Sequence, residues 1–131
     1  MAMPGRNGQG KLEGKVAIIN MSSTAGLSGV RGISSYVAGK HGVIGLTRAA
    51  AMDYAAQNVR VNALAPGPIR TERIASLSDE ARRPIILSVP MRRIGTPEDV
   101  SAAAVWLCSD EAAYITGAVI SIDGGRMAGW G

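Results

Sequence analysis

Three short apolar runs, separated by segments with helical periodicity, restrict the fold of this chain more than any other feature. They occupy residues 16–21, 60–65 and 119–122. Each is mostly apolar and too short for a helix, as is typical of strands that are buried on both faces of a sheet. Strands that alternate with helices form parallel sheets with right-handed crossovers. The pattern therefore predicts an α/β fold of order β-α-β-α-β, with three main strands and crossover helices.

The longest helix is predicted over residues 35–58. Its apolar positions recur about every 3.6 residues, at Val37, Ile44, Ala51 and Tyr54. Glycine costs a helix up to about 1 kcal/mol relative to alanine. The repeated Gly39, Gly42 and Gly45 therefore indicate that something packs unusually close to that side.

A second long helix has clear start signals. Thr96 precedes Pro97, Glu98 and Asp99, which combine an N-cap residue, a proline in the first turn and early acidic residues. We expect this helix to end near Cys108. Residues 69–95 lack a regular pattern, except for a short helix expected over residues 79–87.

Composition limits the class of protein. The 131 residues predict one domain over residues 15–131, after a flexible tail over residues 1–14. No apolar run is long enough to span a membrane. The net charge of +4 comes from scattered basic residues without interleaved aromatics, which argues against a nucleic-acid partner. The single cysteine, Cys108, fits a reducing compartment, and we expect a cytoplasmic protein.

Ser23, Tyr36 and Lys40 form the candidate catalytic group. Tyr36 and Lys40 are four residues apart, so a helix places them on one side. A nearby ammonium lowers the pKa of a phenol from its free value of about 10 towards the range useful for general acid–base chemistry. Ser23 follows the first strand, at the sheet end where α/β proteins bind ligands. The alternative is that Tyr36 and Lys40 are an ordinary amphipathic pair.

Four segments resemble a known family in their order and spacing. They are "INMSSTAG", "SSYVAGKHGVIGLTRAAAMDYA", "VRVNALAPGPIRTE" and "RIGTPEDVSAAAVWLCSDEAAYITGAVISIDGG". Over roughly residues 16–126 they resemble the C-terminal half of the classical short-chain dehydrogenases/reductases. The resemblance implies a partial Rossmann-like sheet, NAD or NADP as cofactor, and interconversion of a carbonyl and a secondary alcohol.

The resemblance also implies roles for individual residues. It assigns orientation of the substrate carbonyl to Ser23, because the thirteen-residue step to Tyr36 is usual in the family and favours Ser23 over Ser22. Tyr36 would transfer the proton, and Lys40 would bind the nicotinamide ribose and lower the Tyr36 pKa. The implied cofactor-binding positions are Tyr36, Lys40, Pro66, Gly67, Ile69 and Thr71.

The sequence departs from the family in the segment that binds the pyrophosphate of the cofactor. The segment "LEGKVAII" resembles the family's first strand, yet "INMSSTAG" follows it in place of a glycine-rich turn and helix. The glycines of "GRNGQG" precede the strand and are better explained by a flexible tail. Losing two or three contacts to phosphate would weaken cofactor binding by roughly several hundredfold. The residues that select NAD or NADP in the family fall in the part that this chain lacks, so the sequence does not indicate which of the two cofactors is preferred.

The missing strands and helices also have a consequence for assembly. They would leave an unpaired sheet edge and uncovered apolar surface, which another chain has to cover. We therefore expect a homo-oligomer. The alternative to an enzyme is a catalytically inactive truncated family remnant that acts as an oligomerisation or interaction module.

Overall fold

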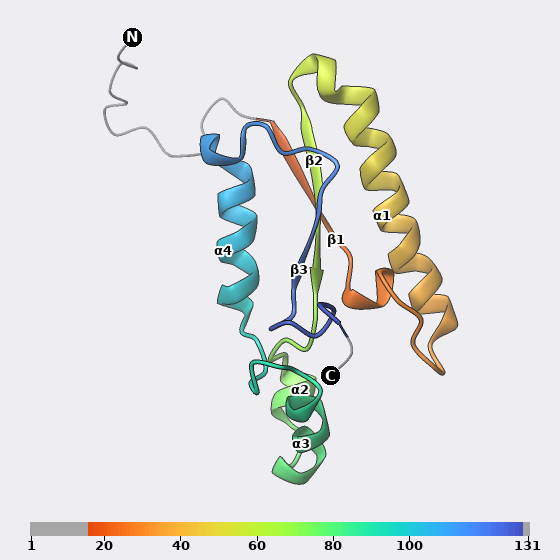
Figure 1. Ribbon diagram of the computed structural model, residues 1–131, viewed down its shortest axis with the longest axis vertical. Coiled ribbons are helices and arrows are strands. Elements are labelled where there is room, and N and C mark those ends of the chain that lie inside the picture. Colours follow the sequence, from red (N-terminus) through yellow and green to blue (C-terminus); the bar gives the residue numbers. More distant parts are fainter. Residues whose placement is uncertain (1–15, 130–131) are drawn as a thin grey trace, which may run out of the picture.

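A three-stranded parallel sheet lies between two long helices in the computed structural model, which describes residues 16–129 (Figure 1). The strands are β1 (Ala17–Met21), β2 (Arg60–Pro66) and β3 (Val119–Ile122), in the spatial order β1-β2-β3. Both strand pairs are parallel. The predicted α/β class and the three strands are confirmed. The tail predicted over residues 1–14 lies outside the described residues.

Helix α1 (Ser34–Tyr54) covers one side of the sheet, and α4 (Pro97–Cys108) covers the other (Figure 1). On α1, only Ile44, Thr47 and Ala51 are buried. Tyr54 was predicted to belong to the apolar stripe but stays half exposed. The chain turns there through a short 3₁₀ segment, Ala55–Gln57, and the left-handed Asn58 (φ 63°) into β2.

The prediction of close packing at the α1 glycines is wrong for the described part of the chain. A Cβ atom placed on Gly39, Gly42 or Gly45 would meet nothing within 4 Å. All three glycines are exposed, because only the opposite side of the helix contacts the sheet. Close packing within residues 16–129 therefore does not explain why glycine occupies these three positions.

Small aliphatic residues build the core on the α4 side of the sheet. Leu64, Leu107 and Ala112 are fully buried and pack together. Asn62 in β2 is also fully buried. Its side-chain amide donates to the carbonyl of Ile115 at 3.0 Å, and its side-chain oxygen accepts from the backbone N–H of Ala118 at 3.0 Å. Asn62 therefore fixes the loop that leads into β3.

The start of α4 was predicted correctly and is reinforced by a capping box. The Thr96 hydroxyl accepts from the Asp99 N–H at 3.2 Å, and the Asp99 carboxylate accepts from the Thr96 N–H at 2.8 Å. Arg93 donates to the same carboxylate at 2.8 Å. The hydrogen bonds from Arg93 and Thr96 hold the pKa of Asp99 well below its ordinary value.

Two small helices lie beyond the carboxyl ends of the strands (Figure 1). The predicted helix over residues 79–87 is α3 (Asp79–Leu87). The preceding α2 (Glu72–Ala75) was not predicted, because four residues are too few to show a helical period.

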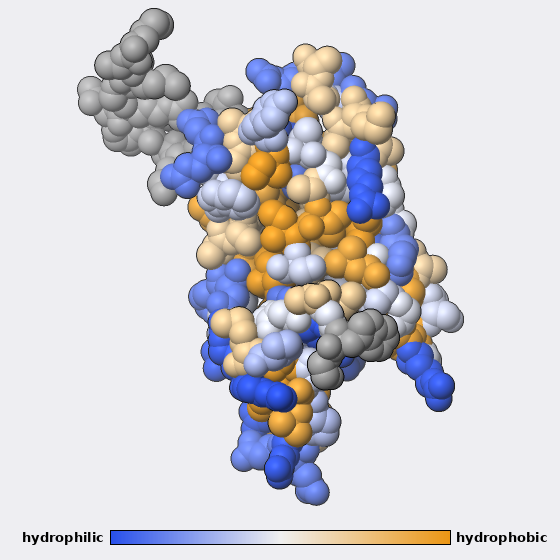
Figure 2. Space-filling view, viewed as in Figure 1, coloured by the Kyte–Doolittle hydropathy of each residue, from blue (hydrophilic) through white to orange (hydrophobic). Residues whose placement is uncertain are grey.

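The outer edge of β1 is unpaired within residues 16–129, as expected from the sequence. Ile18 and Met21 of this strand are exposed, as is Val16 just before it. Apolar side chains also gather over the strands between α1 and α4 on the face of the molecule shown in Figure 2. The described part of the chain therefore leaves considerable apolar surface uncovered.

Candidate functional site

An open cavity of about 680 Å³ lies where β1 and β2 end, bounded by the start of α1 and by α2 and α3. Ser23, Tyr36 and Gly67 all line it. Ligands bind at the carboxyl ends of strands in parallel α/β sheets. The structure thus brings two of the three predicted catalytic residues, Ser23 and Tyr36, and one further predicted cofactor-binding residue, Gly67, to the same cavity.

Ser23 is held by the short 3₁₀ segment that follows β1. It caps the segment Thr24–Gly26 with its hydroxyl oxygen, which accepts from the Ala25 N–H at 3.1 Å. A serine hydroxyl that accepts through one lone pair keeps its own proton for donation. Ser23 can therefore donate a hydrogen bond to an oxygen atom in the cavity.

Tyr36 and Lys40 occupy the first turns of α1. The Tyr36 side chain is accessible at the cavity, since the residue is 48% exposed. The Lys40 Nζ lies 5.6 Å from the centroid of the Tyr36 ring, within the range of a cation–π contact. The same Nζ donates to the Met21 carbonyl at 3.0 Å. This bond ties the Lys40 ammonium to the end of β1.

Ser22 fixes the backbone behind this site, a role that was not anticipated from the sequence. Its hydroxyl donates to the Lys40 carbonyl at 2.9 Å, and the residue is buried. Gly26 packs against the same carbonyl, since a Cβ there would lie 2.7 Å from the Lys40 oxygen. The only signal in the sequence was that a serine, Ser22, directly precedes Ser23.

The other predicted cofactor-binding residues follow β2. Pro66 ends the strand, and the Gly67 N–H donates to the Ile122 carbonyl at 3.0 Å. A Cβ on Gly67 would lie 2.8 Å from the Asp123 Cβ, so the turn requires glycine. Ile69 forms an isolated parallel bridge with Gly95, and Thr71 is exposed just before α2. Pro66, Ile69, Thr71 and Lys40 are not among the residues that line the cavity.

The described residues fit the nicotinamide end of a dinucleotide cofactor better than its pyrophosphate. Tyr36, Lys40 and Gly67 stand together where β1 and β2 end. However, β1 continues into Ser22, Ser23 and a three-residue 3₁₀ segment, and no glycine-rich turn leads from it into a long helix. Residues 16–129 therefore contain no cradle for the pyrophosphate after β1, and the glycines of "GRNGQG" lie outside this range.

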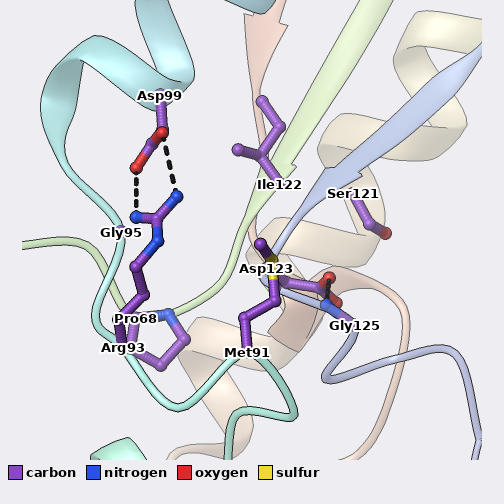
Figure 3. Close-up of a pocket in the computed structure, with 10 residues that line it drawn as sticks. Pro68, Met91, Arg93, Gly95, Asp99, Ser121, Ile122, Asp123 and Gly125 are labelled. Carbon is purple, nitrogen blue, oxygen red and sulfur yellow. Dashed lines mark hydrogen bonds and ion pairs between the residues drawn. The ribbon is translucent and has the colours of Figure 1, made fainter.

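A second cavity of about 330 Å³ lies beside the first and shares only Pro68 with it. Figure 3 shows Arg93 and Asp99 paired on one side of it and Asp123 on another. The Asp123 carboxylate accepts from the backbone N–H groups of Gly125 and Met127 at 2.9 and 2.8 Å. Because both carboxylates already have partners within the chain, this cavity is a structural feature around the start of α4 and the end of β3.

Residues 16–129 contain neither a cluster of metal-binding side chains nor a helix suited to a membrane. No group of three or more His, Cys, Asp and Glu side chains in residues 16–129 is placed to hold a metal ion. In the same part of the chain, no helix combines the length and apolar character needed to cross a membrane.

Comparison with known proteins gives consistent matches. Residues 6–126 match the family described as enoyl-(acyl carrier protein) reductase. The 3-oxoacyl-[acyl-carrier-protein] reductase FabG of Chlamydia muridarum is 44% identical over 109 residues, which are 83% of this chain and 44% of that protein. The cyclohexanol dehydrogenase of an Acinetobacter species is 45% identical over 108 residues, or 82% of this chain and 42% of that enzyme.

Solved structures match equally well. The structure of ElxO with NADP bound is 40% identical, with a TM-score of 0.81, over 86% of this chain and 47% of ElxO. A 4-hydroxyisoleucine dehydrogenase complexed with NADH is 39% identical, with a TM-score of 0.80, over 87% of this chain and 48% of that structure. The chain spans less than half the length of these relatives. Its fold is Rossmann-like, and the chain belongs to the short-chain dehydrogenase/reductase family.

Proposed function

We propose that the chain acts as an NAD(P)-dependent oxidoreductase that interconverts a carbonyl and a secondary alcohol. The observation that carries this proposal is the placement of Ser23 and Tyr36 on one cavity, with the Lys40 ammonium over the Tyr36 ring. Relatives named 3-oxoacyl reductase and cyclohexanol dehydrogenase support this reaction class. Neighbouring structures that hold NADP or NADH support the cofactor.

Each residue of the site has a defined part in this reaction. Ser23 donates a hydrogen bond to the substrate oxygen and positions the carbonyl. During reduction, the Tyr36 hydroxyl gives its proton to that oxygen; during oxidation, the phenolate takes the proton back from the alcohol. The Lys40 ammonium stabilises the negative charge that develops on the Tyr36 oxygen. When bound, the nicotinamide supplies or accepts the hydride at the substrate carbon.

The cofactor would be held mainly at its nicotinamide end. Lys40 and Tyr36 would bind the ribose hydroxyls, and the positions beside the nicotinamide would be Pro66, Gly67, Ile69 and Thr71. The exposed position of Thr71 leaves its side chain free for a ligand.

A titration with NADH and NADPH, followed by nicotinamide fluorescence, tests the cofactor part of the proposal. We expect saturable binding that Lys40→Ala weakens, and turnover of at least one ketone or secondary alcohol that Tyr36→Phe abolishes. Failure of both cofactors to bind at millimolar concentration would contradict the proposal. That result would instead favour the inactive remnant, in which the chain serves as an association module.

We also propose that the protein is a homo-oligomer built from one truncated Rossmann-like domain over residues 15–131. The unpaired edge of β1 and the exposed Leu46 and Met52 on α1 support association. The single cysteine, Cys108, is free, which is compatible with the reducing cytoplasm. Light scattering on the purified chain tests the oligomeric state, and a monodisperse monomer would contradict it.

A further inference from the structure

The cavity that Ser23 and Tyr36 line has positively charged side chains at its wall. Among residues 16–129, its only charged lining residues are Arg31 and Arg126, and no aspartate or glutamate of this range lines it. Arg31 lies in the loop between Ser23 and Tyr36, and Arg126 lies in the turn after β3. Two segments that are distant in the sequence therefore bring two positive charges, and no negative one, to the same cavity.

Both guanidinium groups are available for a ligand. Within residues 16–129, neither makes an ion pair or a hydrogen bond to another side chain or to the backbone. Several other arginines are engaged: Arg60 and Arg92 donate to backbone carbonyls, and Arg93 pairs with Asp99. Arg31 and Arg126 are exposed, which places their charges at the open side of the cavity and not in its interior.

The rest of the lining is largely apolar. It includes Ile33 near the start of α1, Ile74 of α2, Ile85 of α3, and Met127 next to Arg126. A ligand that fills this cavity would meet hydrogen-bonding groups at Ser23 and Tyr36, apolar side chains beside them, and positive charge at the opening. Guanidinium groups bind carboxylates through strong charge-assisted hydrogen bonds.

We propose that Arg31 and Arg126 select a substrate that carries a carboxylate, joined to the reacting carbonyl by an apolar segment. This inference rests on the proposed oxidoreductase function and names the substrate class of the same site. The arginines act as specificity residues: they bind the end of the substrate remote from the reacting carbon, whereas Ser23 and Tyr36 contact its oxygen.

Calorimetric titration with matched ligands tests the proposal directly. The probes are levulinate and 7-oxooctanoate, each compared with its methyl ester, so that each pair shares its carbon chain and ketone and differs in the negative charge and one methyl group. Exposed charge pairs contribute modestly, so we expect at least one acid to bind about fivefold more tightly than its ester. Arg31→Gln and Arg126→Gln should each weaken binding of that acid about twofold or more. The double variant should bind acid and ester equally.

Arg48→Gln is the matched control, because Arg48 is an exposed arginine of α1 that does not line this cavity. It should leave the preference for the acid unchanged. Thermal unfolding of every variant establishes that the chain remains folded. Equal affinity for both acids and their esters, no binding of any probe, or a preference that survives the double substitution would each overturn the proposal.

Turnover of the same ligand pairs with NADH and NADPH separates this inference from the proposed function. If the acid binds preferentially but no ligand is reduced, carboxylate selection stands and the oxidoreductase proposal fails. If acid and ester are reduced with equal kcat/KM, the oxidoreductase proposal stands and carboxylate selection fails. Preferential reduction of the acid, lost in the Arg31→Gln, Arg126→Gln double variant, supports both.

Discussion

Gly26 allows α1 to lie close to the segment after β1, because it has no side chain. It is buried between Ser22 and the first turns of α1, and a Cβ there would lie 2.7 Å from the Lys40 carbonyl oxygen. That oxygen belongs to the backbone, so the helix itself would have to move. Gly26→Ala should lower the free energy of unfolding by about 1–3 kcal/mol and shift the start of α1, with Tyr36 and Lys40, away from Ser23. Urea denaturation measures the first effect.

Gly45→Ala is the informative control for Gly26. A Cβ at Gly45 meets open space on the exposed side of α1, so alanine should stabilise the helix by up to about 1 kcal/mol. Equal effects of the two substitutions would show that the packing of Gly26 against Lys40 has no energetic importance.

Tyr36 is the residue whose chemistry can be tested most simply. General acid–base groups contribute roughly 10²–10⁴-fold to rates, so Tyr36→Phe should lower kcat by at least about a hundredfold while KM for the carbonyl changes little. Tyr54→Phe, a half-exposed tyrosine at the other end of α1, should leave kcat unchanged. Steady-state kinetics under saturating cofactor provide the measurement. Wild-type kcat in the Tyr36→Phe variant would exclude Tyr36 as the proton donor.

Among the elements, α4 could be predicted because its start signals are local. Thr96, Pro97 and Asp99 fix the first turn within four residues, and the structure adds the ion pair with Arg93. The α1 glycines show the limit of such reasoning. Their spacing indicated a close partner, but whether a neighbouring element reaches that side of a helix depends on tertiary structure, which the spacing does not contain.

The capping box of α4 gives a prediction about pH. Hydrogen bonds from Arg93 and Thr96 lower the pKa of Asp99 below its ordinary value of 3.8. The folded state therefore binds fewer protons than the unfolded state at acidic pH. The stabilisation is fully present above this ordinary value and is lost as the pH falls below it. At about pH 6, the free energy of unfolding should be larger for the wild-type protein than for Asp99→Asn. This difference should shrink towards about pH 2.

Urea denaturation across this pH range is the measurement for Asp99. Arg93→Gln should reduce the same pH dependence, because it removes the guanidinium that contributes most to the lowered pKa. A difference between wild type and Asp99→Asn that stays constant with pH would show that the carboxylate charge does not stabilise the cap.

At the scale of the whole molecule, the sequence predicts the part of the site that is built from consecutive segments. It does not predict the part that is built from segments far apart in the chain. The positions of Ser23 and Tyr36 follow from one strand, one loop and one helix that are consecutive in sequence. Arg31 and Arg126 meet at the cavity only because β3 returns the chain to the end of the sheet where Ser23 lies. Their pairing requires the parallel arrangement in three dimensions, and neither arginine stands in a pattern that identifies it in the sequence.

The edge of β1 is the feature of the whole molecule most directly connected with association. The Val16 carbonyl and the Ser22 N–H bond to β2. Because bonding alternates along a parallel ladder, Ala17 and Ile19 direct their N–H and C=O groups towards the unpaired side. Beside this edge, Ile18 is 45% exposed. Unpaired edges with apolar neighbours attract other chains, and a lysine at the edge opposes this.

Ile18→Lys should therefore shift the purified chain towards smaller species, as measured by light scattering over a dilution series. Leu87→Lys is the matched control, because Leu87 is an exposed leucine at the end of α3, away from β1 (Figure 1). It should leave the distribution of species unchanged. If Leu87→Lys dissociates the oligomer and Ile18→Lys does not, association uses the surface near α2 and α3. In that case oligomer formation and access to the Ser23–Tyr36 cavity would be coupled, because α2 and α3 help to line that cavity.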